Sequence, residues 1–183
     1  MRLASPRSAI LTCALAAAVL VAGCKSAGEE GTREGLGVHV GGLKYTVFIT
    51  RQINQHLASD RGYYQGPEPK PGFTYYGVFI QVCNETPGFK TPVKDFTVRD
   101  SQGNEFHPLD IGGANVFAYH PRRLSKNACV PEAGTPAATG PTGGALLVFN
   151  FPVQTIENRP LKLDIRTVTP EGKVESEKIL LDL

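Results

Sequence analysis

The segment from Phe73 to Asn84 reads FTYYGVFIQVCN and decides the expected fold class. Successive side chains of a strand point to opposite faces, and both faces of this segment are apolar. The first face carries Tyr76, Val78, Ile80 and Val82, and the second carries Phe73, Tyr75, Phe79 and Cys83. A strand with two apolar faces lies in the middle of a sheet or beneath a loop. Because the second face ends in Cys83, we expect the loop that contains Cys129 to cover it.

The chain on both sides of this segment also favours strands. Residues 43–53 and 161–167 alternate apolar and polar side chains, which is typical of half-buried strands. Shorter candidate strands occupy residues 96–99, 105–107, 116–119, 145–151 and 174–181, and Asp100–Asn104 predicts a hairpin turn. No segment of helical length has a clean period of 3.6 residues. The sequence therefore predicts an all-β fold, an immunoglobulin-like antiparallel β-sandwich of about seven to eight strands over residues 38–183.

The first residues have the pattern of an export signal. Arg2 and Arg7 precede an almost entirely apolar run, Ala9–Ala22. As a helix its 14 residues span about 21 Å, which is too short for a bilayer core of about 30 Å. The sequence Val21-Ala22-Gly23-Cys24 resembles a bacterial lipobox. The resemblance implies that residues 1–23 are a lipoprotein signal peptide and that Cys24 carries a thioether-linked diacylglycerol. An ordinary secretory signal and an uncleaved helix are the alternatives.

Charge limits the partners of the mature chain. The 183 residues carry 19 Lys and Arg against 17 Asp and Glu. Removal of residues 1–23 takes Arg2 and Arg7 and no acid, so 17 basic groups face 17 acidic groups. A neutral chain does not favour nucleic acid as a partner. We expect attachment to the membrane through the acyl chains on Cys24, with the Gly-rich and charged residues 24–37 as a flexible tether.

Two cysteines remain in the mature domain, Cys83 and Cys129. An even pair in an exported, oxidising setting predicts a structural disulfide. Two free thiols are the main alternative. A redox or metal role would favour a close pair such as Cys-x-x-Cys, which the sequence lacks.

Two long loops interrupt the strands, residues 56–72 and 120–144. Loops of this length in a compact domain are often functional. In the first loop, Tyr63 and Tyr64 are candidates for an aromatic platform that binds sugar or peptidoglycan. In the second, Arg122 and Arg123 are candidates for contact with an anionic polymer or lipid headgroup. The alternative for both pairs is an ordinary loop or core role.

Motifs for catalysis and metal binding are missing from the sequence. His39, His56, His107 and His120 lie far from one another, and no zinc or serine-nucleophile motif occurs. A run of four carboxylates near a turn could bind Ca²⁺ or simply be solvated: Asp95, Asp100, Glu105 and Asp110. We therefore expect no catalytic residues, no metal and no cofactor.

The order of three motifs suggests a family. Val82-Cys83-Asn84 closes one strand, the Asp100 to Gly103 turn is followed by Phe106, and Gly144–Pro152 forms a strand closed by proline. This order resembles the telokin-like domain family of unknown function, which occurs on secreted and lipid-anchored bacterial proteins. The resemblance covers roughly residues 38–183. It implies an immunoglobulin-like fold and an extracytoplasmic setting, and it implies no activity.

Together these features predict a lipid-anchored protein on the extracytoplasmic face of the cell membrane. We expect a non-catalytic binding or structural module whose two long loops contact a protein or an envelope polymer. The alternatives are a cell-envelope hydrolase and an accessory subunit of an envelope assembly.

Overall fold

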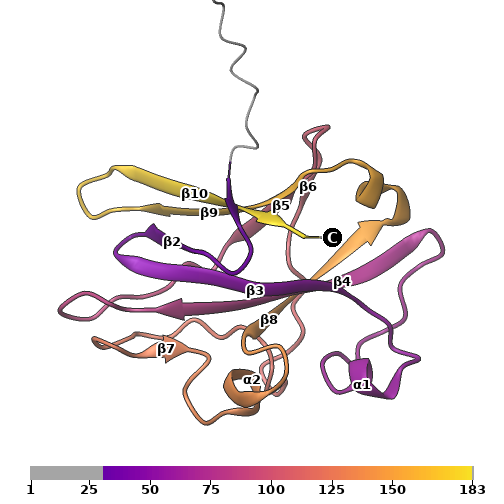
Figure 1. Cartoon of the computed structure of the whole chain (residues 1–183), viewed down its shortest axis with the longest axis horizontal. Coiled ribbons are helices and arrows are strands. Elements are labelled where there is room, and N and C mark those ends of the chain that lie inside the picture. The colour runs from indigo at the N-terminus through magenta and orange to yellow at the C-terminus, as the bar shows by residue number, and fades with distance from the viewer. Residues whose placement is uncertain (1–30, 183) are drawn as a thin grey trace, which may run out of the picture.

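The computed structural model describes residues 31–182 and shows a sandwich of two β-sheets (Figure 1). Sheet A has the strand order β1-β10-β9-β5-β6 and lies in the upper part of Figure 1. Its strands are β1 (Thr32–Arg33), β5 (Phe96–Arg99), β6 (Glu105–Phe106), β9 (Leu161–Val168) and β10 (Val174–Leu181). Neighbouring strands are antiparallel except β1 and β10, which are parallel. The predicted all-β fold class is confirmed.

Sheet B has β4 (Phe73–Cys83) at its centre. One edge of β4 pairs with β3 (Leu43–Ile53), which pairs in turn with β2 (Gly37–Val40). The other edge is shared between β8 (Ala145–Pro152) and the short β7 (Cys129–Val130). Three short helices connect strands of the described chain: α1 (Ala58–Arg61), α2 (Pro136–Thr139) and the 3₁₀ helix η1 (Val153–Glu157). Within residues 31–182, none of the helices has the length and apolar character needed to cross a bilayer.

The strand order is that of an immunoglobulin sandwich. In that fold, strands A, B and E share one sheet and strands C, F and G share the other, with C′ beside C in variable-type domains. Here β3, β4 and β8 stand in the places of A, B and E, and β6, β5, β9 and β10 stand in those of C′, C, F and G. The place of strand D, beside β8, is taken by the irregular segment 109–119. Two backbone hydrogen bonds join this segment to β8: Leu109 N donates to Val148 O (2.7 Å), and Leu146 N of β8 donates to Phe117 O (2.6 Å).

The inner core lies between the sheets and uses the first face of β4. Tyr76, Val78, Ile80 and Val82 are all buried there, as the alternation predicts. They pack in one cluster with apolar side chains of the other strands: Val38, Tyr45, Phe96, Val98, Phe149, Phe151, Leu161, Leu163, Ile165 and Ile179. The strands alternate side chains with period two, so both inner faces meet in one apolar layer.

The second face of β4 has a different cover from the one expected. Tyr75 and Phe79 are buried in a separate cluster with Tyr63, Tyr64 and Ile53. The loop before β4 and the segment 109–119 supply this cover, whereas the loop with Cys129 does not. The reason is that Cys129 belongs to β7, which pairs beside β4 within sheet B instead of lying over its face.

The other predicted strands are mostly confirmed, with one error and three omissions. Strands occur at or close to every predicted range except 116–119. In that range Ala118 makes an isolated bridge to Leu146 and no regular ladder forms. Phe117 packs on the outer face of sheet B, Tyr119 packs against the inner core, and Val116 is 62% exposed. The omitted strands are the two-residue β1 and β7, which are too short to give a period-two pattern, and the four-residue β2. The described chain has ten strands, of which seven have at least four residues.

The predicted tether is too long at its C-terminal end. Residues 31–37 belong to the fold, because β1 pairs with β10 and Glu34 links β3 to the residue that follows β10. Its carboxylate accepts hydrogen bonds from Thr50 N (3.1 Å) and Asp182 N (3.0 Å). Burial raises the pKa of Glu34, although these hydrogen bonds act in the opposite direction. The glycines and charged residues of this stretch therefore belong to a chain segment that is bonded to β10 and β3. The rest of the predicted tether, residues 24–30 with Cys24, lies outside the described residues.

Candidate functional site

The loop between β3 and β4 is a structural cover. Tyr63 lies edge-on to Phe79 and to Phe117, with ring centroids 5.1 and 4.9 Å apart. Tyr64 lies edge-on to Tyr75 at 5.1 Å. Only 8% of Tyr63 and 6% of Tyr64 is exposed, so the predicted aromatic platform is wrong. The physical reason is that the second face of β4 is apolar, and the two rings are what shields it from water.

A buried ion pair holds this loop in place. Asp60 is 1% exposed, and its carboxylate accepts hydrogen bonds from the Arg51 guanidinium and from Asn54 N (2.9 Å). The Arg51 guanidinium also lies 6.0 Å from the centroid of the Tyr63 ring. A buried carboxylate is stable only when paired in this way. The loop between β3 and β4 is thus fixed both by its aromatic side chains and by one charge pair.

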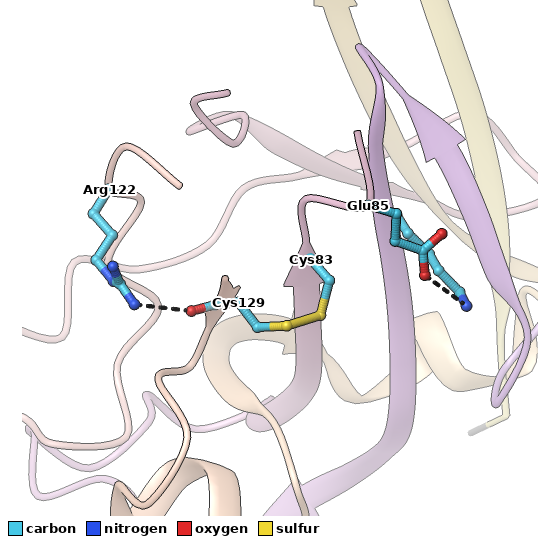
Figure 2. The surroundings of a disulfide bond; sticks show 5 residues. Cys83, Glu85, Arg122 and Cys129 are labelled. Carbon is cyan, nitrogen blue, oxygen red and sulfur yellow. Dashed lines mark hydrogen bonds and ion pairs between the residues drawn. A yellow bond between two sulfur atoms is a disulfide. The ribbon is translucent and has the colours of Figure 1, made fainter. Parts of the chain in front are cut away.

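The predicted disulfide between Cys83 and Cys129 is present, and it joins opposed residues of β4 and β7 (Figure 2). The next residue, Asn84, is fully buried and donates to Gly88 O (2.8 Å) and Leu124 O (3.1 Å). The disulfide and this amide therefore fasten the loop after β4 to the chain that leads into β7.

The predicted basic pair does not form a single surface. Arg122 points back to the disulfide, where Nη2 donates to Cys129 O (3.1 Å) and lies 3.5 Å from the Glu132 carboxylate (Figure 2). Arg123 instead stacks over the exposed ring of Phe89, with Cζ 4.2 Å from the centroid. Both arginines lie near the Cys83 end of β4, whereas Tyr64 packs near its other end. The structure therefore does not bring the two predicted pairs together.

The strongest candidate site lies between β8 and the start of β5, where a cavity of about 670 Å³ opens. We call it the β8 cavity. It forms because segment 109–119 runs along β8, so that His107 and His120 at its two ends line the same space as Lys94 and Asp95, which precede β5. The charged or ionisable side chains that line it are Lys94, Asp95, His107, Asp110 and His120. Leu109, Ile111, Leu146 and Leu147 add apolar surface.

The wall of the β8 cavity also contains a half-buried tyrosine, Tyr119, whose hydroxyl already makes a hydrogen bond. Tyr119 donates to Val93 O (2.9 Å), and its ring lies edge-on to Phe96 at 5.2 Å. Burial raises the pKa of Tyr119 far above its usual range, with a smaller contribution from Tyr45. The Tyr119 hydroxyl therefore stays protonated and holds the wall of the cavity in shape.

The four candidate carboxylates separate into two roles. Asp95 and Asp110 line the β8 cavity, whereas Asp100 and Glu105 serve the hairpin between β5 and β6. Glu105 pairs with Arg99 at 2.8 Å. Within residues 31–182, no group of three or more His, Cys, Asp or Glu side chains is placed to hold a metal ion. A Ca²⁺ site built from the four carboxylates is thus not formed.

Asp100 has a structural role in the turn between β5 and β6. Its carboxylate accepts hydrogen bonds from Gln102 N (3.0 Å), Asn104 N (2.8 Å) and Asn158 Nδ2 (3.1 Å). Burial alone would raise the pKa of Asp100, but these bonds and one from the Asn104 side chain outweigh it and lower the pKa. The predicted turn is confirmed, and Gly103 closes it with a positive φ of 85°.

A second, smaller hollow of about 440 Å³ lies on the other side of segment 109–119. Asp110 and Ile111 line both spaces, and Tyr63 and Tyr64 contribute to the second one. The β8 cavity has the volume and the mixture of apolar and polar groups that are common in sites for small ligands. Its carboxylates, imidazoles and ammonium group suit a polar ligand that carries both hydrogen-bond donors and acceptors.

Sequence reasoning weighed the histidines and carboxylates of this cavity but did not group them. Lys94 and His120 are 26 positions apart, and no motif spacing links them. The only available signal was the length of irregular chain between Phe106 and Cys129. Their proximity depends on the path of segment 109–119, of which the sequence pattern predicted only residues 116–119, as a strand.

Comparison with known proteins gives the fold and no activity. No family model matches the chain, and no curated protein matches its sequence. The yjhA protein from Bacillus subtilis is similar in structure, with a TM-score of 0.57 and 11% identity over 82% of this chain and 99% of that one. Two others have lower TM-scores of 0.46 and 0.41: the putative lipoprotein ycdA from B. subtilis, and an uncharacterized β-sandwich protein from Clostridium difficile. The match to ycdA has 8% identity and covers 79% of this chain and 38% of that one. The match to the C. difficile protein has 10% identity and covers 81% of this chain and 94% of that one.

Proposed function

We propose that this protein is a lipid-anchored, extracytoplasmic binding module of the cell envelope without catalytic activity of its own. The lipobox-like sequence before Cys24 supports the anchor. The disulfide between Cys83 and Cys129 supports export to an oxidising compartment. The immunoglobulin-type strand order supports membership of the telokin-like domain family.

The observation that carries the binding function is the β8 cavity. It combines two carboxylates, two imidazoles and one ammonium group around an apolar floor. We propose a short peptide or a glycan of the envelope as the ligand class, because such ligands offer amide, hydroxyl and charged groups together with apolar surface. Tyr63, Tyr64, Arg122 and Arg123 then act mainly in stabilising the loops.

Crosslinking in intact cells tests this proposal. A photo-crosslinking amino acid at Leu109, which lines the cavity and is 37% exposed, is expected to capture a specific partner. The matched control is the same label at Leu57, which is 52% exposed on the loop before α1. Asp110→Asn and His120→Ala should lower capture at Leu109 without changing the thermal unfolding midpoint. Equal capture at both positions would contradict a cavity-specific ligand, whereas repeated capture of one protein would favour the accessory-subunit alternative.

A cell-envelope hydrolase is the second candidate, because Asp95 and Asp110 line the same cavity. Two carboxylates across a cleft are the minimal set for glycoside hydrolysis. This alternative predicts that purified protein degrades envelope polymer and that Asp95→Asn and Asp110→Asn each abolish the degradation. Binding of polymer without turnover would exclude it.

A further inference from the structure

The outer face of sheet A carries a third hollow, of about 870 Å³, which we call the sheet A hollow. Its charged lining residues are Lys94, Arg99, Arg166 and Lys178 against Asp95 and Asp164. Four basic and two acidic groups give a formal charge of +2, whereas the mature chain as a whole has 17 of each. Arg99 is paired with Asp164 (2.8 Å) and with Glu105 (2.8 Å), so the excess of positive charge on this face comes from Lys94, Arg166 and Lys178.

Exposed apolar side chains lie beside this charge. Val168 and Val174 are opposed residues next to the turn of the β9–β10 hairpin, and both line the sheet A hollow. They are 63% and 47% exposed. Cations next to exposed apolar side chains are the combination that favours the interface between lipid headgroups and acyl chains.

The path of the N-terminal chain connects this face to the anchor. In β10, Ile179 and Leu181 point into the inner core, so Leu180 points to the outer face, yet it is only 6% exposed. Gly31 covers it, since a Cβ added to Gly31 would lie 3.1 Å from Leu180 Cγ. In Figure 1 the indigo chain passes β9 and β10 of sheet A before it reaches β2. Because β1 pairs with β10 as an edge strand, the described chain begins at the β10 edge of sheet A.

The covalent distance to Cys24 is short. Seven residues separate Cys24 from Thr32, and seven residues span at most about 25 Å when fully extended. An anchor on Cys24 therefore keeps the β10 edge of sheet A, and with it the neighbouring outer face of that sheet, within reach of the bilayer.

We infer that the outer face of sheet A docks on anionic phospholipid headgroups of the membrane that holds the anchor. The cations of the sheet A hollow contact lipid phosphates, and Val168 and Val174 contact the edge of the acyl region. Lys94 and Asp95 line both this hollow and the β8 cavity, so the cavity opens at the rim of the docked face. The inference rests on the proposed anchor at Cys24 for the orientation, and its charge argument is independent of the anchor.

Lysine footprinting tests the orientation without relying on lipidation in the cell. The chain from Cys24 to Leu183 contains every described residue, and its Cys24 thiol can be coupled to maleimide lipid in vesicles. A membrane-impermeant acylating reagent then reports each lysine. On vesicles with phosphatidylglycerol, we expect acylation of Lys94 and Lys178 to slow about threefold or more relative to uncoupled protein. The exposed Lys70 and Lys126 serve as internal controls and should react at unchanged rates.

Charge reversal tests the chemistry of the contact. Lys94→Glu with Arg166→Glu should abolish the protection of Lys178, whereas Lys70→Glu with Lys126→Glu changes net charge equally and should leave it intact. Unchanged acylation of Lys94 and Lys178 on anionic vesicles would overturn the inference. Equal protection on vesicles of phosphatidylcholine alone would overturn the role of anionic headgroups. Mass spectrometry of the native protein separately tests the lipid on Cys24, so a failure of the anchor is distinguishable from a failure of docking.

Discussion

The two faces of β4 are both apolar, yet they are covered in different ways. The first face meets sheet A, and strands from the whole chain contribute to that contact. The second face meets two irregular segments, which place a few aromatic side chains over it. The difference teaches that a long aromatic loop need not be a binding surface. In this domain the loop between β3 and β4 completes the fold, and the β8 cavity forms where the other irregular segment leaves the sheet.

The largest expected effect concerns the inner face. Phe149→Ala removes a fully buried ring from the inner core and should lower the free energy of unfolding by about 3–5 kcal/mol. Urea unfolding followed by circular dichroism measures the change. Tyr63→Ala on the second face should cost less, because the loop can readjust over the gap. Equal losses for both variants would remove the contrast between the two faces.

Removal of the disulfide tests whether the loop with Cys129 contributes to the stability of the residues that cover the second face of β4. Cys83→Ser with Cys129→Ser opens a link between residues 46 positions apart. We expect the free energy of unfolding to fall by about 2–4 kcal/mol, because the unfolded chain gains freedom. Amide hydrogen exchange in residues 57–66 should stay slow. Faster exchange there would mean that the disulfide also supports the cover of Tyr75 and Phe79.

The ion pair beneath the loop gives a smaller, local effect. Asp60→Ala leaves Arg51 without its buried partner and should cost about 2 kcal/mol, less than a fully buried pair because the Arg51 side chain is 34% exposed. Hydrogen exchange of residues 57–66 should accelerate more than that of β5 or β9. Glu68→Ala is the matched control on the same loop, since the Glu68 side chain is 70% exposed. Uniform acceleration throughout the domain would show that the loop and the inner core unfold as one unit.

The smallest expected effect is the acid dependence contributed by Asp100, which lies at the edge of sheet A, away from the second face. Its pKa is lower in the folded state than the ordinary value of 3.8. Its carboxylate therefore stabilises the fold above about pH 4, and this stabilisation is lost as the pH falls through the folded pKa. Asp100→Asn should destabilise the domain by about 1 kcal/mol at pH 7 and by less at pH 3. An equal loss at both values would contradict the role of ionisation.

Much of the architecture follows from local sequence. The strands β3, β4, β8, β9 and β10 are long enough for period-two alternation to show, and a two-faced β4 requires a central position with cover on each side. The turn at Asp100–Asn104 and the pairing of Cys83 with Cys129 were also accessible, since turn chemistry is local and only two cysteines remain after the predicted cleavage. The short strands β1 and β7 were not predicted, because two residues carry no periodicity and their pairing depends on partners that are distant in the sequence.

What the sequence determined by itself is the sandwich and its central strand; the lipid anchor at Cys24 stays a prediction. The tertiary structure decided which side chains stay accessible. Tyr63 and Tyr64 are residue types that are common in binding surfaces. Here they cover the apolar second face of β4 instead, because burying that apolar area stabilises the fold. Conversely, Asp95, His107 and His120 form one cavity only because segment 109–119 follows β8. Local patterns encode which face of a strand is apolar, and only the folded chain fixes what comes to lie against that face.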